Sequence, residues 1–165
     1  MKGKTISLRS QTKGVIVEII IFLLILLFLY ASLSKVVDYH RFEGQMANQP
    51  FPHWLARFFT WTVPPIELII VAMFAIGGLF SKERIRTWAL YASLVLMSLF
   101  TIYTAAILLH FFPRVPCSCG GVISKLTWKQ HMYFNAFFVV ISIMAIRLIQ
   151  STHQPENQGF AIKAA

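Results

Sequence analysis

Four long apolar runs dominate this sequence and limit what it can fold into. They cover residues 15–37, 63–80, 88–112 and a last run that begins at 128 or 131 and ends at 149. A helix of about 20 residues crosses a hydrocarbon core of about 30 Å, because each residue adds about 1.5 Å. Backbone groups in lipid must bond to one another, and a helix achieves this within one segment. The sequence therefore predicts four transmembrane helices.

The composition supports a membrane protein. Hydrophobic residues make up 57% of the chain and charged residues 13%, whereas a soluble domain has about 25% charged residues. Short connections make neighbouring helices antiparallel, so the predicted fold is an all-α integral membrane four-helix bundle. We expect this domain at 15–150, after a basic N-terminal segment at 1–14 and before a polar tail at 151–165.

The basic start followed by an apolar run is also typical of a secretory signal peptide. The apolar core of a signal peptide has about 7–15 residues and ends at a cleavage site with small residues. Here the apolar core is longer and continues into Ser34, Lys35 and Val36. We therefore interpret 15–37 as an uncleaved first transmembrane helix.

The segment at 38–62 mixes polar and aromatic residues. The spacing of Leu55, Phe58 and Phe59 favours a short helix in the membrane interface. Pro64 and Pro65 then predict the start of the second transmembrane helix, since proline is tolerated in a first helical turn. We expect that helix to fray where it closes, at residues 77–78.

The distribution of basic residues predicts the orientation. Nine lie on the side of the two termini, namely Lys2, Lys4, Arg9, Lys13, Lys82, Arg84, Arg86, Arg147 and Lys163. Six lie opposite, namely Lys35, Arg41, Arg57, Arg114, Lys125 and Lys129. Because the basic side faces the cytoplasm, we expect cytoplasmic termini and a periplasmic 114–130 break in a bacterial inner membrane. The net charge of +9 forms no patch interleaved with exposed aromatics, which argues against nucleic acid and for contact with lipid headgroups.

The 114–130 break contains the two cysteines of the chain, Cys117 and Cys119. A disulfide between them would close a small strained ring, and strain raises the reduction potential. So short a loop also gives little stabilisation through closure entropy. We therefore favour a reactive pair over a structural disulfide. Two idle thiols remain the alternative, and whether the two sulfurs bond to each other stays open.

Two further residues are candidates for chemistry. Thr127 is a predicted helix cap, which places His131 in the first turn of the last helix, close to the cysteines. There it would tune a thiol or move a proton, or it is an interfacial histidine. Glu67 lies in an apolar run, where a carboxylate is costly unless it is paired. It is either an acid favoured by the helix dipole or the partner of Lys35 or a histidine inside the bundle.

Other polar and aromatic residues receive structural interpretations. Trp88, Trp128 and Tyr133 are predicted anchors at the membrane interface, and Asn135 is a predicted helix–helix hydrogen-bonding residue. The cysteines with two of the histidines, from His40, His53, His110 and His131, would complete a tetrahedral metal site. That spacing matches no structural zinc pattern, so we predict no metal.

Several of these residues also resemble a known family. The sequence Tyr-Ala-Ser-Leu-Ser-Lys at 30–35, then Phe42, Gln-Pro-Phe-Pro at 49–52 and Pro-Ile-Glu-Leu at 65–68 resembles the DoxX-like superfamily of four-helix membrane proteins. The sequence Cys-Ser-Cys-Gly-Gly at 117–121, followed by Leu-Thr-Trp at 126–128 and His131, is similar to its redox-associated MauE branch. The resemblance covers about residues 15–150.

The resemblance implies a role in redox chemistry. MauE-type proteins are associated with methylamine utilisation, where a thioredoxin-like partner works with them on the disulfides of methylamine dehydrogenase. It implies that Cys117 and Cys119 exchange disulfides with a periplasmic thioredoxin-like protein or oxidoreductase. His131 would then be a proton partner, and Glu67 a packing residue or proton relay.

Several questions stay open at this point. The pair here is Cys-x-Cys rather than Cys-x-x-Cys, and no second pair is present to relay electrons. Electrons would leave to a membrane quinone or to the partner, and no bound cofactor is predicted. A non-enzymatic scaffold or assembly factor for a periplasmic oxidoreductase is the alternative function, and a small transporter or metal carrier is a third.

Overall fold

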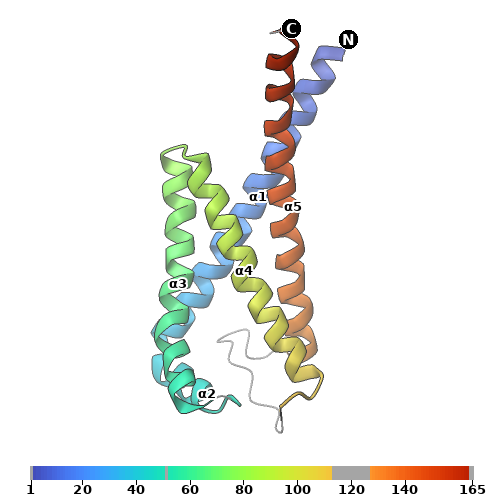
Figure 1. Cartoon of the computed structure of the whole chain (residues 1–165). Helices are drawn as coiled ribbons and strands as arrows, with labels where there is room; N and C mark the ends of the chain where they lie inside the picture. Colours follow the sequence, from blue (N-terminus) through green and yellow to red (C-terminus); the bar gives the residue numbers. More distant parts are fainter. Residues whose placement is uncertain (1, 51, 113–126, 164–165) are drawn as a thin grey trace.

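The structure is a computed structural model that describes residues 2–50, 52–112 and 127–163, with side chains at 11–50, 52–112 and 127–151. The described residues form helices α1 (Lys2–Val37), α2 (Tyr39–Ala47), α3 (His53–Leu79), α4 (Glu83–Leu108) and α5 (Trp128–Lys163). The predicted all-helical fold is confirmed (Figure 1).

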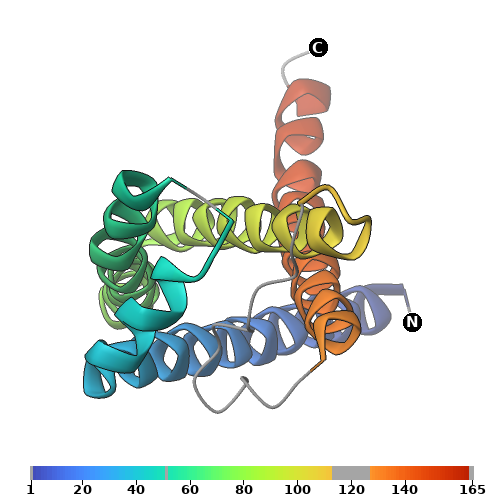
Figure 2. The same cartoon turned by 90° about the horizontal axis from the view of Figure 1, so that it is seen from below.

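The four long helices form an antiparallel bundle. Helix α1 packs against α3 and α5, and α4 also packs against α3 and α5, so the four helices surround a common centre (Figure 2). Four segments are long and apolar enough to cross a membrane, namely Gln11–Val37, His53–Leu79, Glu83–Leu108 and Trp128–Ser151. The chain is therefore an integral, multi-pass membrane protein.

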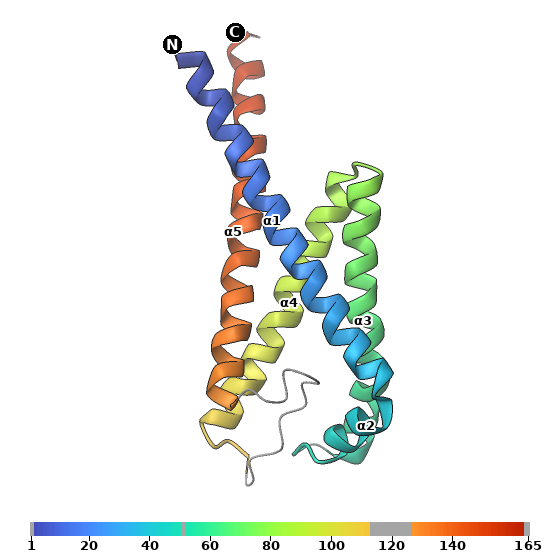
Figure 3. The same ribbon diagram turned by 180° about the vertical axis from the view of Figure 1, so that it is seen from behind.

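The two ends of the bundle differ in what lies there. The short helix α2 packs on α3 at one end, which we call the α2 end, and both chain termini lie at the other, which we call the terminal end (Figure 3). Helices α1 and α5 extend past the α3–α4 turn at the terminal end (Figure 3). Helix α1 begins at Lys2 and helix α5 ends at Lys163, so both are longer than the apolar runs that predicted them.

Helix α3 corrects the predicted position of the prolines. It begins at His53, so residues 53–62 belong to it and do not form a separate interfacial helix. Pro64 and Pro65 consequently lie inside the helix. Proline removes a backbone donor, but helices in lipid tolerate this where neighbouring groups compensate, because breaking the helix would leave more polar groups unpaired. Only α2 remains as a short helix between the first two spans.

The α3–α4 turn also differs from the prediction, because α3 does not fray at its glycines. The backbone N–H of Lys82 donates to Gly77 O at 2.9 Å, and Ser81 has a left-handed φ of 50°, which together define a Schellman-type helix end. A Cβ added at Gly77 would lie 2.5 Å from Cγ of Arg86. Glycine is therefore needed here for the close approach of α4.

The core is apolar and tightly packed along the bundle axis. Leu24, Phe28, Phe74 and Leu90 are at most 2% exposed. Large apolar side chains such as Ile19 and Val95 remain more than half exposed, as expected for surfaces that meet lipid. Small buried residues let helices approach closely in membranes, and three of them, Ala89, Ser93 and Ala145, occur on α4 and α5, which pack together.

Candidate functional site

A cavity of about 590 Å³ lies at the α2 end of the bundle. Most of its wall is apolar and aromatic, and all five helices contribute residues to it. Its polar residues include Lys35 on α1, Glu67 on α3, Tyr103 on α4, His131 and Asn135 on α5, and Gln49, which directly follows α2. The cavity therefore gathers polar groups from distant parts of the chain within a membrane-spanning fold.

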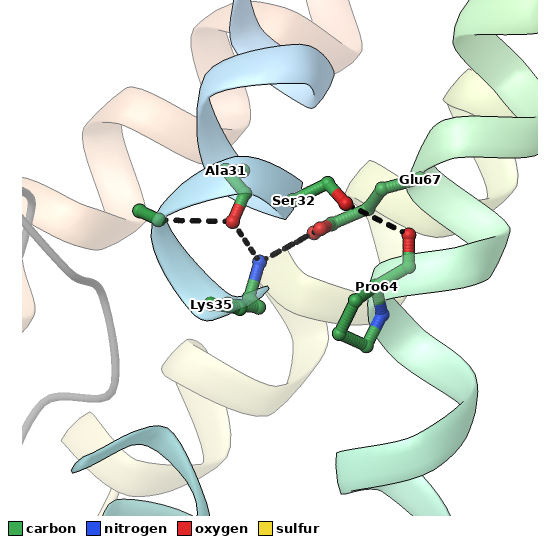
Figure 4. Close-up of polar contacts among 6 residues, drawn as sticks. Ala31, Ser32, Lys35, Pro64 and Glu67 are labelled. Carbon is green, nitrogen blue, oxygen red and sulfur yellow. Dashed lines mark hydrogen bonds and ion pairs between the residues drawn. The ribbon is translucent and has the colours of Figure 1, made fainter. Parts of the chain in front are cut away.

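An ion pair joins α1 to α3 in this wall. The ammonium of Lys35 donates to the two carboxylate oxygens of Glu67 at 2.7 and 2.9 Å, and to the carbonyl oxygen of Ala31 at 3.2 Å (Figure 4). The two side chains are only 13% and 1% exposed. Glu67 therefore pairs with Lys35 inside the bundle. The alternative, an acid at a helix start, is wrong because α3 begins at His53.

Neighbouring groups hold this pair in position. The hydroxyl of Ser32 donates to the carbonyl oxygen of Pro64 at 3.0 Å, a second buried contact between α1 and α3 (Figure 4). The ammonium of Lys35 also lies 5.9 Å from the ring centroid of Phe42 on α2, within the range of a cation–π interaction. The two carboxylate oxygens of Glu67 and the carbonyl oxygen of Ala31 give the ammonium three hydrogen-bond acceptors. The burial of a charge requires such partners.

A second polar contact was not anticipated from the sequence. The hydroxyl of Tyr103 donates to the side-chain oxygen of Gln49, which is 2% exposed, and the Gln49 amide donates to the carbonyl of Gln45 at 3.1 Å. Gln49 lies in the Gln-Pro-Phe-Pro stretch that carried the family resemblance. That stretch was the one sequence feature that could have drawn attention to Gln49. Tyr103 sits in an apolar run and gave none.

Tyr103 also contacts both sides of the cysteine-containing segment at 113–126. Its ring centroid lies 6.1 Å from that of Phe112 and 6.5 Å from that of Trp128. Phe112 is the last described residue before the segment, and Trp128 is the second one after it. Trp128 lines the cavity, whereas Trp88 and Tyr133 are exposed.

The start of α5 is fixed by a capping box. The backbone N–H of Gln130 donates to the hydroxyl of Thr127 at 3.4 Å, and Oε1 of Gln130 accepts from the backbone N–H of Thr127 at 2.8 Å. This reciprocal arrangement is the known N-terminal signature of helices, and it confirms the predicted cap. It places His131 in the first turn of α5, where it lines the cavity and lies 6.1 Å from the ring of Trp128.

The structure thus brings two of the four candidate residues, Glu67 and His131, to one cavity. Cys117 and Cys119 lie outside the described residues. His40, His53 and His110 are exposed, and the described part of the chain contains no group of three or more metal-ligating side chains.

Asn135 is 8% exposed and lines the cavity. No hydrogen bond joins its side chain to another described residue, so the predicted helix–helix bond is not formed there.

The fold and the cavity define a class: a multi-pass membrane protein of four long helices with a buried ion pair near one end of the bundle. Comparison with known families makes this more specific. The family model for the methylamine utilisation protein MauE matches residues 13–148, and the chain belongs to this family. No curated protein and no solved structure matches the chain significantly.

Proposed function

We propose that this protein takes part in thiol–disulfide exchange with a thioredoxin-like or oxidoreductase partner at the periplasmic face of a bacterial inner membrane. The observation that carries the proposal is the convergence on Tyr103. Phe112 and Trp128 flank the segment that contains both cysteines, and both contact this one ring at the cavity that holds His131 and Glu67.

The proposed exchange uses Cys117 and Cys119 as the dithiol. The thiolate of one attacks a sulfur of the partner's disulfide, which forms a mixed disulfide and releases one partner thiolate. The second cysteine then attacks the mixed disulfide, which closes the Cys117–Cys119 bond and releases the second partner thiolate. In this direction two electrons pass to the partner. The reverse sequence oxidises the partner and leaves Cys117 and Cys119 as thiols, whose electrons then need an acceptor.

The residues of the cavity have separate roles in this proposal. His131, one helical turn into α5, accepts or returns a proton as the thiols ionise, which suits an imidazole. Glu67 and Lys35 fix α1 against α3, so the cavity wall keeps its shape while disulfides change. The methylamine context belongs to the family by its name, and this chain's own partner is a protein with an accessible cysteine pair.

The proposed orientation puts α2 and the cysteine segment in the periplasm. Both termini lie at one end of the bundle and α2 at the other (Figure 1), and the sequence counts nine basic residues for the terminal side and six for the other side. The larger basic count favours a cytoplasmic terminal end. The periplasm is an oxidising compartment, in which disulfide chemistry persists.

The test is mixed-disulfide trapping in intact membranes. We expect Cys117→Ser or Cys119→Ser, whichever removes the resolving thiol, to accumulate a covalent complex with the partner, and the double variant to form none. Ser118→Ala, between the two cysteines, is the matched control and should behave as the wild type. Full oxidation of the partner in the presence of the double variant would contradict the proposal and favour the non-enzymatic assembly factor.

A further inference from the structure

The cavity at the α2 end has chemistry that the exchange reaction alone does not require. It combines a volume of about 590 Å³ with aromatic walls and a buried amide, inside a bundle that spans a membrane. We propose that this cavity binds the ring of a membrane-dissolved quinone, which is the electron acceptor of the dithiol. The choice of a quinone rests on the proposed function, whereas the existence of a binding site rests on the cavity.

The size and the walls fit a flat ring with an apolar tail. Cavities that bind small molecules have volumes of about 300–1,000 Å³ and are mostly apolar. Phe58, Phe100, Tyr103 and Phe134 are among the lining residues, and aromatic side chains stack on planar rings at favourable offset or edge geometries. A quinone tail would continue along such walls or into the lipid.

Asn135 is the group that points to a polar ligand. The residue is 8% exposed and lines the cavity, and no hydrogen bond joins its side chain to another residue in the described part of the chain. Buried polar side chains in proteins nearly always have partners, so a ligand would satisfy this amide. The amide both donates and accepts. It can therefore donate to a quinone carbonyl and accept from a hydroquinone hydroxyl.

The charges favour a neutral ligand. Lys35 and Glu67 are both buried and bonded to each other, so the cavity wall carries no net charge from this pair. A lipid phosphate or a carboxylate would leave an unbalanced charge in a medium of low dielectric constant. His131 lies four residues before Asn135 on α5, and both line the cavity, so a proton carrier lies one helical turn from the amide.

The electron balance explains why an acceptor is needed. The sequence contains two cysteines, so a disulfide passed on by this pair cannot be regenerated by a second pair within the sequence. Oxidation of the dithiol breaks two S–H bonds, forms one S–S bond and releases two electrons and two protons. A quinone takes up both electrons and both protons and leaves as the hydroquinone.

Fluorescence quenching in lipid nanodiscs tests the binding directly. Trp128 lines the cavity, whereas Trp54, Trp61 and Trp88 are 71%, 66% and 64% exposed. A full-length variant that keeps only Trp128 is titrated with a benzoquinone carrying a decyl tail, and a variant that keeps only Trp61 reports collisions in the lipid. We expect saturable quenching of Trp128 and non-saturating quenching of Trp61.

Two substitutions with a matched control locate the site. Ala31→Phe fills the cavity and should abolish the saturable component, whereas Ala75→Phe, at an exposed position of α3, should leave it intact. Asn135→Leu removes one hydrogen bond and should raise the half-saturating concentration about 3–10-fold. Decylbenzene, which has the tail without the carbonyls, should not displace the quinone.

The outcomes separate this inference from the exchange reaction. Identical quenching of Trp128 and Trp61, no effect of Asn135→Leu, or displacement by decylbenzene would each overturn it, the last showing an acyl-chain site. The double cysteine-to-serine variant should bind the quinone as tightly as the wild type. Loss of binding in that variant would also overturn the cavity as the site, while mixed-disulfide trapping independently decides the exchange.

Discussion

Each end of the bundle has an ion pair between helices, and the two pairs differ in how far the carboxylate is buried. At the α2 end, Lys35 and Glu67 form an ion pair whose side chains are 13% and 1% exposed. At the terminal end, Arg86, whose side chain is 12% exposed, bonds to Glu18 and Glu83, whose side chains are 62% and 54% exposed. The carboxylates at the terminal end are therefore open to solvent, whereas the carboxylate at the α2 end is buried beside a cavity.

The two pairs should contribute differently to the free energy of unfolding, and the buried pair is not the arrangement that stability alone would favour. Exposed ion pairs contribute little, and their loss is tolerated. A buried pair costs desolvation free energy, and an apolar pair of similar volume often does as well or better. The α2 end therefore has an arrangement that packing does not explain. The terminal end, where Gly77 packs directly against Arg86, is arranged for close contact.

The largest expected effect comes from separating the buried pair. Glu67→Leu should lower the free energy of unfolding by about 3–5 kcal/mol, because it leaves the Lys35 ammonium buried without its counter-ion. Reversible unfolding in mixed micelles measures the change. The double variant with Lys35→Met should recover most of the loss, and Glu83→Gln at the terminal end should change stability by less than about 0.5 kcal/mol. Equal losses at both ends would contradict the distinction.

Adding one methyl group should test how closely α4 approaches α3 at the terminal end. Gly77→Ala forces a Cβ against Arg86 and should cost about 1–3 kcal/mol, as overpacking does. Gly78 has no atom within 4 Å of an added Cβ, so Gly78→Ala should be stabilising by about 0.5–1 kcal/mol through the helix preference for alanine. Thermal unfolding of both variants in the same detergent is the measurement, and a destabilised Gly78→Ala would be the contrary result.

The contact between Ser32 and Pro64 predicts a smaller effect. Ser32→Ala removes a buried donor between α1 and α3 and should cost about 1 kcal/mol, the usual size for one hydrogen bond within a membrane bundle. Ser34→Ala is the matched control, because the Ser34 hydroxyl bonds only to Ala31 within its own helix. Similar unfolding curves for the two variants would show that the contact does not join the helices energetically.

The smallest expected effect is local to the start of α5. Thr127→Val removes the capping hydroxyl and should cost about 0.5–1 kcal/mol. Backbone hydrogen exchange should speed up in the first turn, which contains His131. Thr101→Val, which loses only a bond to the carbonyl of Met97 within α4, should leave that turn unchanged. Unaltered exchange in both variants would mean that the capping box does not fix the turn.

The sequence predicted the parts of the fold that lipid dictates. Long apolar runs in a membrane can only be helices, and the cap at Thr127 depends on residues three apart in the sequence, so both were found. The start of α3 was wrong because prolines mark a helix start in water, whereas inside a membrane-spanning helix they are tolerated.

The site was predictable only in part, for a similar reason. Glu67 stood out because a carboxylate is rare in such a run, but its partner is 32 residues away, and sequence spacing does not choose between Lys35 and a histidine. The contact between Tyr103 and Gln49 joins residues 54 apart and had no local signature. The cap at Thr127 depends on neighbouring residues in the sequence, whereas the walls of a cavity depend on how the helices cross.

The pairing of Lys35 with Glu67 also has a consequence for biosynthesis. Lys35 is made 32 residues before its counter-ion, which at about 5–20 residues per second is a delay of roughly two to six seconds. During that interval the long lysine side chain can reach the headgroup layer only if the tip of α1 stays shallow. We therefore expect full insertion of α1 to follow the arrival of α3, so that the first hairpin enters the membrane as one unit.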